Sequence, residues 1–275
     1  MKDDILLGKE TEYKSQYDAS LIYPIERAAN REKLTMPTEL KDTSLPFYGI
    51  DVWTGYEISW LNPQGKPQVA IAEFVIPCES SHIVESKSFK LYLNSFNNTR
   101  FEQAEMVRVR MQHDLSAGFG ADIDIRFFNV GSYDLSHPDL GDCIDDEDVN
   151  IEHYTPAPEL LKHASGEEVT QRLHSHLLKS NCPVTNQPDW ATVIIDYRGT
   201  PLDRQALLKY IISYREHDDF HEHCVEQIFC DLLNLGGFEY LTVTARYTRR
   251  GGLDINPSRS THPLNTMPVG RMPRQ

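Results

Sequence analysis

Alternating apolar and polar residues predict several β-strands along the chain. Residues 68–76 alternate until a proline ends the run, and apolar residues at 47–53 predict an earlier strand. Residues 119–128 alternate in the same way, and branched residues follow a proline at 190–197. The remainder of residues 1–60 is polar and punctuated by prolines, so it is expected to be irregular. The pattern therefore predicts a protein with extensive β-sheet.

One segment has a clear helical period. In residues 220–235 the apolar positions recur every three or four residues, which predicts a helix with one buried face. Asp218 and Asp219 precede this segment and are expected to cap it. The residues of the buried face are His221, Val225, Ile228 and Leu232.

The second half of the chain repeats the first at a spacing of 119 residues. Residues 101–115 are ambiguous between helix and strand, but they correspond to 220–235 and are therefore predicted to be helical. Identical pairs at this spacing are Asn62 and Asn181, Lys90 and Lys209, Phe101 and Phe220, Gly118 and Gly237, and Phe119 and Phe238. The shared order of strand, strand, helix, glycine turn and strand predicts two tandem modules.

An acidic stretch divides the two halves. Residues 139–152 contain seven acidic residues and no basic one, with prolines nearby, which is typical of a solvated linker. The predicted domains are accordingly 1–150 and 151–275.

Composition and charge narrow the classes of function. The 275 residues are 40% hydrophobic and 25% charged, as in globular proteins, and no apolar run is long enough to span a membrane. The net charge of −14 disfavours nucleic-acid and anionic-membrane partners, although five arginines and one acid follow from Arg249 onward. The amino terminus lacks an apolar signal core, and none of the five cysteines has CxxC spacing. We therefore expect a cytoplasmic enzyme or small-ligand binder with free thiols.

Cys182 and Asp189 form the clearest chemical pair. Cys182 lies in a loop of prolines, asparagines and threonine, and Asp189 begins the strand that follows. A thiol nucleophile and a carboxylate proton donor are thus held beside a rigid sheet. The alternatives are an inert buried thiol and a turn-capping aspartate, but the polar loop argues against burial of Cys182 in an apolar core.

The two halves differ in the polar residues that they carry. Each half lacks what the other has, which is expected if a single site uses residues from both halves. Opposite Cys182 and Asp189 stand Pro63 and Ala70, opposite Glu85-Ser86-Lys87 stand Arg204-Gln205-Ala206, and opposite His221-Glu222 stand Glu102-Gln103.

Three segments carry a family resemblance: Glu85-Ser86-Lys87-Ser88-Phe89-Lys90-Leu91-Tyr92, the pair Cys182 and Asp189, and Phe220-His221-Glu222. Over most of its length the chain resembles the long, tandem form of the NADPH-dependent 7-cyano-7-deazaguanine reductases, the nitrile reductases of queuosine biosynthesis. The resemblance implies an α+β fold of two tunnelling-fold modules, each an antiparallel sheet backed by helices, that form barrels across a homodimer. It also implies reduction of a nitrile to an aminomethyl group by two hydrides from NADPH.

The resemblance assigns roles to individual residues. Cys182 would form a thioimidate with the nitrile, and Asp189 would protonate the nitrogen. Substrate contacts would come from Val84, Glu85, Ser86, Phe220, His221 and Glu222. NADPH would bind Ser86, Lys87, Arg250 and Gly251, with Lys90 as a weaker candidate. The chain has no GxGxxG motif after a strand, so a Rossmann-type cofactor site is not expected.

Three other interpretations compete with this one. Histidines and cysteines cluster near the predicted helix, as in zinc sites, but their positions around the helix diverge and no metal is expected. A cyclohydrolase-like tunnelling-fold enzyme would need that metal and would not need Glu85-Ser86-Lys87. A non-catalytic purine-binding protein would not need Cys182 as a nucleophile. The cluster consists of His217, His221, His223, Cys224 and Cys230, with His174 and His176 elsewhere.

Overall fold

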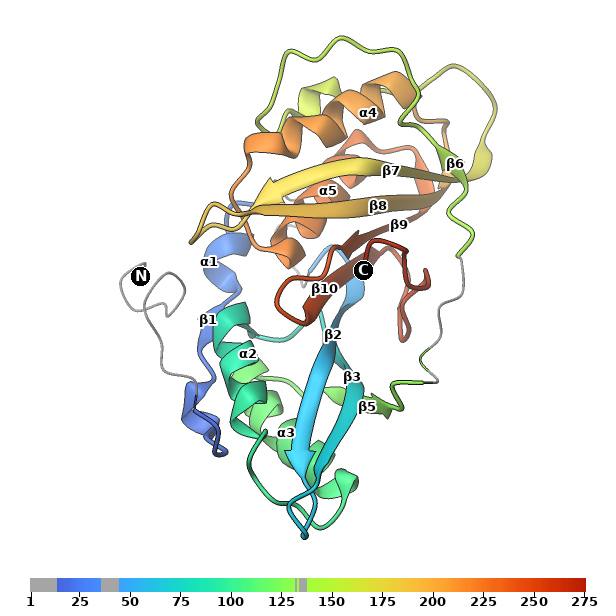
Figure 1. Ribbon diagram of the computed structural model, residues 1–275. Helices are drawn as coiled ribbons and strands as arrows, with labels where there is room; N and C mark the ends of the chain where they lie inside the picture. The colour runs from blue at the N-terminus through green and yellow to red at the C-terminus, as the bar shows by residue number, and fades with distance from the viewer. Residues whose placement is uncertain (1–13, 36–44, 132, 134–137) are drawn as a thin grey trace. The chain divides into compact units, whose positions relative to one another are not determined.

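The computed structural model describes residues 14–35, 45–131, 133 and 138–275, which form two units (Figure 1). Expectations for residues 1–13 and 36–44 lie outside the described residues. The first unit contains the described residues within Met1–Glu32, Asp51–Asp134 and Arg249–Asp254; the second contains those within Lys33–Ile50, Leu135–Thr248 and Ile255–Gln275. The predicted boundary at residue 150 stays a prediction, because neither unit is one continuous segment.

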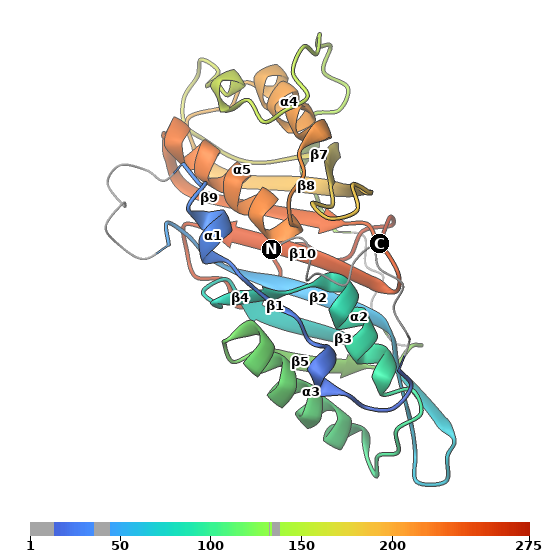
Figure 2. The same ribbon diagram turned by 90° about the vertical axis from the view of Figure 1, so that its left-hand side faces the viewer.

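The first unit is an antiparallel sheet with helices on one face. Its strands lie in the order β5-β3-β2, and α2 and α3 lie together over them (Figure 2). A two-stranded sheet of β1 and β4 lies beside them. The elements are η1 (Ala19–Leu21), β1 (Pro24–Glu26), α1 (Ala28–Arg31), β2 (Tyr48–Leu61), β3 (Pro67–Pro77), β4 (His82–Val84), α2 (Ser86–Ser95), α3 (Ala104–Phe119) and β5 (Asp124–Phe128).

Aromatic side chains join α2 and α3 to this sheet. Phe89 of α2 meets Trp53 and Phe74 edge-on, with ring centroids 4.9 Å and 5.0 Å away. Phe119, at the end of α3, packs against the same Trp53 at 5.6 Å. All four rings are almost completely buried, so burial of aromatic area holds the helices on the sheet.

The second unit has the same plan. Its strands lie in the order β10-β9-β8-β7-β6, and α4 and α5 pack over them. The long β7–β8 hairpin is antiparallel from Val169↔Gly199 to Asn181↔Pro188. The elements are β6 (Asp142–Cys143), η3 (Pro158–Leu160), β7 (Val169–Asn181), β8 (Pro188–Gly199), α4 (Arg204–Ser213), η4 (Tyr214–Glu216), α5 (His221–Leu235), β9 (Phe238–Tyr247) and β10 (Leu253–Ser260).

Each unit contains a buried tyrosine–aspartate pair at the same place in its fold. Tyr92 of α2 donates a hydrogen bond to Asp114 of α3 at 2.8 Å, and Tyr210 of α4 donates to Asp231 of α5 at 2.6 Å. A serine three residues after each tyrosine donates to that tyrosine's carbonyl oxygen at 2.6 Å in both units. The expected α+β fold of two related antiparallel modules backed by helices is confirmed, and the repeated pair is a further similarity between the modules.

Several expectations need correction. The alternation at 119–128 overstates the strand: α3 continues through Phe119, and Gly120, with φ of 65°, ends it before β5 begins at Asp124. The acidic stretch 139–152 is more than a solvated linker, because β6 within it pairs with β7.

Among the described residues, no helix is long and apolar enough to cross a membrane.

The tyrosine–aspartate pairs give a graded stability prediction. Burial raises the pKa of Asp231, and the Tyr210 hydroxyl counteracts this. Tyr210→Phe should lower the free energy of unfolding by about 1–3 kcal/mol, because it removes the donor to a buried carboxylate oxygen. Tyr92→Phe should cost less, because Tyr17 donates to the same oxygen of Asp114 at 2.7 Å. Equilibrium unfolding in urea measures both; an equal or reversed cost would contradict the interpretation.

Candidate functional site

Cys182 lies at the start of the tight loop that joins β7 to β8. Its amide donates to the carbonyl of Gln187, and its carbonyl accepts from the amide of Asn186, both at 2.9 Å. Among the described non-glycine residues, only Asn186 has a positive φ, 57°, which asparagine tolerates better than most residues. These bonds give the thiol a defined position at the tip of the hairpin.

The polar loop argued against burial of Cys182, but the residue is buried. Only 6% of the residue is exposed. Protein groups bond the backbone where β7 enters the loop: the Asn181 amide donates to the His217 carbonyl at 2.8 Å, and the Asp219 amide donates to the Asn181 carbonyl at 3.0 Å. The Asn181 side chain also donates to Asp218 at 2.9 Å. We call these three bonds the Asn181 clamp; it fastens the hairpin to the segment that precedes α5.

Asp189 lies beside His221, at the same end of the second unit. The two residues come from β8 and α5, and Oδ2 of Asp189 is 3.3 Å from Nε2 of His221. The ring of His221 lies against Tyr247 of β9, with centroids 3.9 Å apart and the ring planes inclined by 31°. The register of β8 and β9 causes this grouping, because it pairs Tyr247 with Ala191, two residues after Asp189.

These groups can hold and move a proton. Asp189 is only 7% exposed, and an imidazole within 3.3 Å can share a proton with its carboxylate. Burial raises the pKa of Tyr247 well above its usual value, and Cys224 and Asp189 nearby add to the effect. Tyr247 is therefore a neutral hydroxyl beneath the His221 ring.

A second buried carboxylate determines how α5 begins. Asp219 accepts from the Phe220 amide at 2.8 Å and contacts Nδ1 of His223, while Nε2 of His217 is 3.4 Å away. Burial alone would raise the pKa of Asp219, but the His217 and His223 groups outweigh it and hold the pKa well below its usual range. The N-cap is Phe220, so the expectation that Asp218 and Asp219 cap the helix needs correction; His223 is buried.

Sequence reasoning missed the structural importance of Asn181 and Asp219. Both belonged to segments that were noticed, one beside Cys182 and the other before a helix. One signal could have found them. Both are hydrogen-bonding residues at the ends of loops, and the predicted repeat places these two loop ends at the same end of one module.

In the first unit Glu85 caps α2. Its two carboxylate oxygens accept from the amides of Lys87 at 2.9 Å and Ser88 at 2.7 Å, and the residue is 2% exposed. Val84 is buried at the end of β4, and Ser86 is the first residue of α2. A carboxylate oxygen has two lone-pair directions, so this capping leaves each oxygen able to accept a further bond.

Two of the segments expected to bind the cofactor meet in the first unit, where Lys90 of α2 lies against the turn at Gly251. Gly251, with φ of 60°, lies in a turn that the side chain of Lys90 covers, since a Cβ there would be 3.3 Å from Lys90 Cδ. Tyr56 of β2 holds the turn, because its amide donates to Gly252 at 2.9 Å and its ring lies 4.3 Å from the Arg249 guanidinium. A glycine turn beside cationic side chains suits a phosphate group.

Comparison with known proteins identifies close relatives. Residues 13–127 match a family model described as nitrile reductase, 7-cyano-7-deazaguanine-reductase N-term, and residues 188–265 match one described as QueF-like protein. Proteins named NADPH-dependent 7-cyano-7-deazaguanine reductase match from Chromohalobacter salexigens and Colwellia psychrerythraea. The first is 54% identical over 93% of this chain and 91% of the relative, and the second 50% identical over 98% and 96%. A solved structure, the archaeosine synthase QueF-Like in the apo form, matches 35% of this chain and 95% of its own at 21% identity and a TM-score of 0.29.

The Asn181 clamp should control access to the thiol. Asn181→Ala removes the side-chain bond to Asp218, which costs about 1 kcal/mol and should speed alkylation of Cys182 several-fold. Asn186→Gly is the matched control, because glycine adopts the same φ and keeps the backbone bonds of the loop. Peptide mapping after timed iodoacetamide treatment gives the rates. Equal rates in the wild type and Asn181→Ala would show that the side-chain bond to Asp218 does not hold the loop.

Proposed function

The chain belongs to the NADPH-dependent 7-cyano-7-deazaguanine reductases, and we propose that Cys182 is the nucleophile that attacks the nitrile carbon of the substrate. The protein reduces 7-cyano-7-deazaguanine to 7-aminomethyl-7-deazaguanine, and its relatives share 50% identity or more over nine-tenths of their lengths. Membership of this family favours the reductase over a cyclohydrolase-like enzyme or a non-catalytic purine-binding protein.

A thiol nucleophile makes a nitrile easier to reduce. The nitrile carbon is a weak electrophile, and direct hydride transfer would leave a poorly stabilised nitrogen anion. When the Cys182 sulfur bonds to the carbon and the nitrogen takes a proton, the product is a thioimidate, whose C=N bond accepts a hydride more readily. NADPH supplies two hydrides in succession, and the C–S bond breaks between them to release the thiol.

The observation that carries this proposal is the contact of Asp189 with His221 in the unit that holds Cys182. The nitrogen must gain protons as the C–S and C–H bonds form. We assign the first donation to Asp189, and His221 at 3.3 Å can return a proton to that carboxylate. The low exposure of Asp189 and Cys182 limits access of water to the reactive sulfur.

Carboxylates suit the purine edge of the substrate. A guanine-like ring presents an N–H and an amino group along one edge, and the two oxygens of a carboxylate can accept a hydrogen bond from each. Glu222, in the first turn of α5, is 3% exposed and adjacent to His221. We propose Glu222 as the main acceptor, with Phe220 next to it. For Val84, Glu85 and Ser86 a substrate contact remains part of the proposal.

The cofactor would bind in the first unit. Ser86 and Lys87 begin α2, Lys90 follows one turn later, and the Lys90 side chain covers the Gly251 turn. We propose that Lys87, Lys90 and Arg250 hold the phosphates of NADPH and that the Gly251 turn offers backbone amides. We also propose that the protein forms a homodimer. The net charge of −14 supports the proposal that it has no nucleic-acid partner.

Intact-mass analysis tests the nucleophile directly. Mixed with 7-cyano-7-deazaguanine and no NADPH, the wild type should gain one covalent substrate per chain, and NADPH should discharge the adduct. Cys182→Ala should gain none, whereas Cys143→Ala, which removes the exposed thiol, should behave like the wild type. Absence of an adduct on the wild type while calorimetry shows binding would overturn the thioimidate.

Asp189→Asn tests the proton donor. The amide keeps the shape but loses the transferable proton, so kcat should fall by about 100-fold or more with a smaller change in KM. Asp196→Asn, on the same strand and paired with Arg172, is the matched control and should keep kcat near that of the wild type. Steady-state consumption of NADPH gives both constants. If the two variants lose activity equally, Asp189 has no special role.

A further inference from the structure

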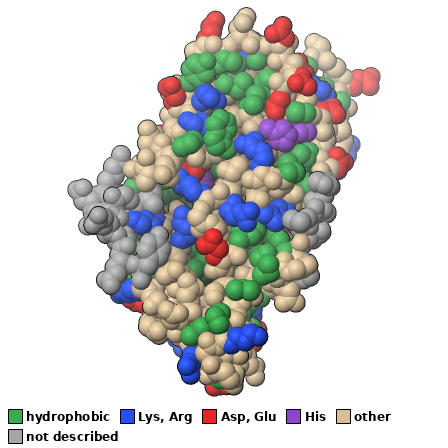
Figure 3. Space-filling model, viewed as in Figure 1, with side chains coloured by type: hydrophobic (Ala, Val, Ile, Leu, Met, Phe, Trp, Pro, Cys, Tyr) green, Lys and Arg blue, Asp and Glu red, His purple; other side chains and the backbone are tan. Residues whose placement is uncertain are grey.

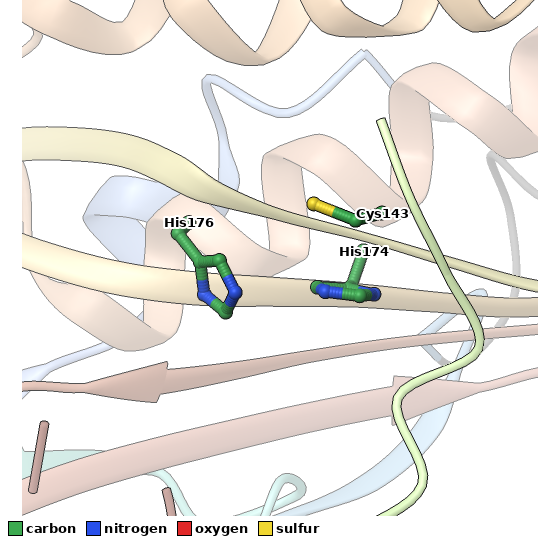
Figure 4. Close-up of side chains that lie close together, drawn as sticks. All are labelled: Cys143, His174 and His176. Atoms are coloured by element: carbon green, nitrogen blue, oxygen red, sulfur yellow. The ribbon is translucent and has the colours of Figure 1, made fainter. Parts of the chain in front are cut away.

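Three potential metal ligands meet at the edge of the second unit, apart from Cys182 and Asp189. They are Cys143 on β6 and His174 and His176 on β7, and one ligand atom of each lies within 4.8 Å of the others (Figure 4). The parallel pairing of the two strands causes this, because Cys143 is the direct partner of His174. His174 and His176 are two residues apart, so a strand presents both on one side.

A β-bulge orients His176. The β7–β8 register shifts between Ser175 and Leu178, so an extra residue is inserted at this point of β7. Nδ1 of His176 lies 2.8 Å from Oγ1 of Thr192 on β8, and its amide donates to Asp145 at 3.0 Å. A histidine that binds a metal usually has its second ring nitrogen engaged in this way, which leaves Nε2 for the ion.

His174 carries a buried nitrogen whose partner is missing. The residue is 8% exposed, and Nδ1 is buried without a hydrogen-bond partner among the described residues. An unpaired buried ring nitrogen costs folding free energy, and a metal ion would satisfy it.

The surroundings favour a cation. Acidic side chains gather over the part of the chain that carries β6, β7 and α4 on the face drawn in Figure 3. Asp145 is the nearest, because it accepts from Ser175 Oγ at 2.6 Å as well as from the His176 amide. A thiolate with two imidazoles selects zinc over calcium or magnesium, which prefer oxygen ligands.

We propose that Cys143, His174 and His176 bind one zinc ion, with water as the fourth ligand. Zinc at its usual bond lengths holds tetrahedral ligands about 3.5 Å apart, so the three side chains need to close by roughly one ångström. The Cys143 thiol gives up its proton and forms a Zn–S bond, and no oxidant or reductant is required. This site goes beyond the proposed nitrile chemistry and is independent of it.

The ion would fasten the acidic stretch to the sheet. Pairing between β6 and β7 covers only two residues, with Ile144 donating to His174 at 3.0 Å as a further bond. A ligand from β6 and two from β7 cross-link the strands at this edge. The site is thus structural: it holds a segment that the sequence alone would leave solvated.

Metal analysis of the full-length protein tests the site. After chelation, return of zinc and gel filtration in metal-free buffer, the wild type should retain about one zinc per chain by mass spectrometry. Cobalt in place of zinc should give the absorption of a thiolate-to-cobalt charge transfer. Cys143→Ser and His176→Gln should each weaken zinc binding at least tenfold, abolish or reduce that absorption, and speed proteolysis near residues 139–147.

Two control variants separate this site from the reaction chemistry. Cys182→Ala removes the proposed nucleophile, and His153→Gln removes an exposed histidine directly after the acidic stretch; both should retain zinc like the wild type. Zinc lost from Cys182→Ala but kept by Cys143→Ser would overturn the assignment. So would a wild type that retains no zinc, or one that retains copper in its place.

Discussion

The Asn181 clamp is the interaction on which the arrangement of the second unit's site depends. It joins the hairpin that carries Cys182 to the residues that introduce His221 and Glu222, through backbone bonds of 2.8 Å and 3.0 Å. Because these bonds use main-chain atoms, they place two separate elements without relying on the reacting side chains. A nucleophile can then be held within a fraction of an ångström while its own sulfur stays available for chemistry.

Two carboxylates at this end of the second unit serve different purposes. Asp219 is surrounded by His217, His223 and an amide, so it stays ionised and orders the helix start. Asp189 lies beside His221, whose ring packs against a neutral tyrosine. The same type of side chain thus has a structural role at Asp219 and a chemical role at Asp189, because the surrounding groups differ.

Much of the fold could be predicted from the sequence, because the strands and α5 have strong periodicity and the repeat resolved α3. The buried position of Cys182 could not, since it depends on bonds between Asn181 and residues nearly forty positions away. The start of the strand after α3 was predicted too early for a local reason. The end of a helix followed by a short strand can produce the same alternation of apolar and polar residues that residues 119–128 show. The docking of 139–152 was missed because composition reports charge and not pairing.

The repeated tyrosine–aspartate pair has a consequence for folding. A chain with two copies of one supersecondary plan risks cross-pairing, in which an element of one copy joins the sheet of the other and traps the chain. The copies differ in ways that penalise such errors: β5 has 5 residues and β9 has 10, so exchanging them would leave edges unpaired. The unequal strand lengths therefore favour pairing of each element within its own module.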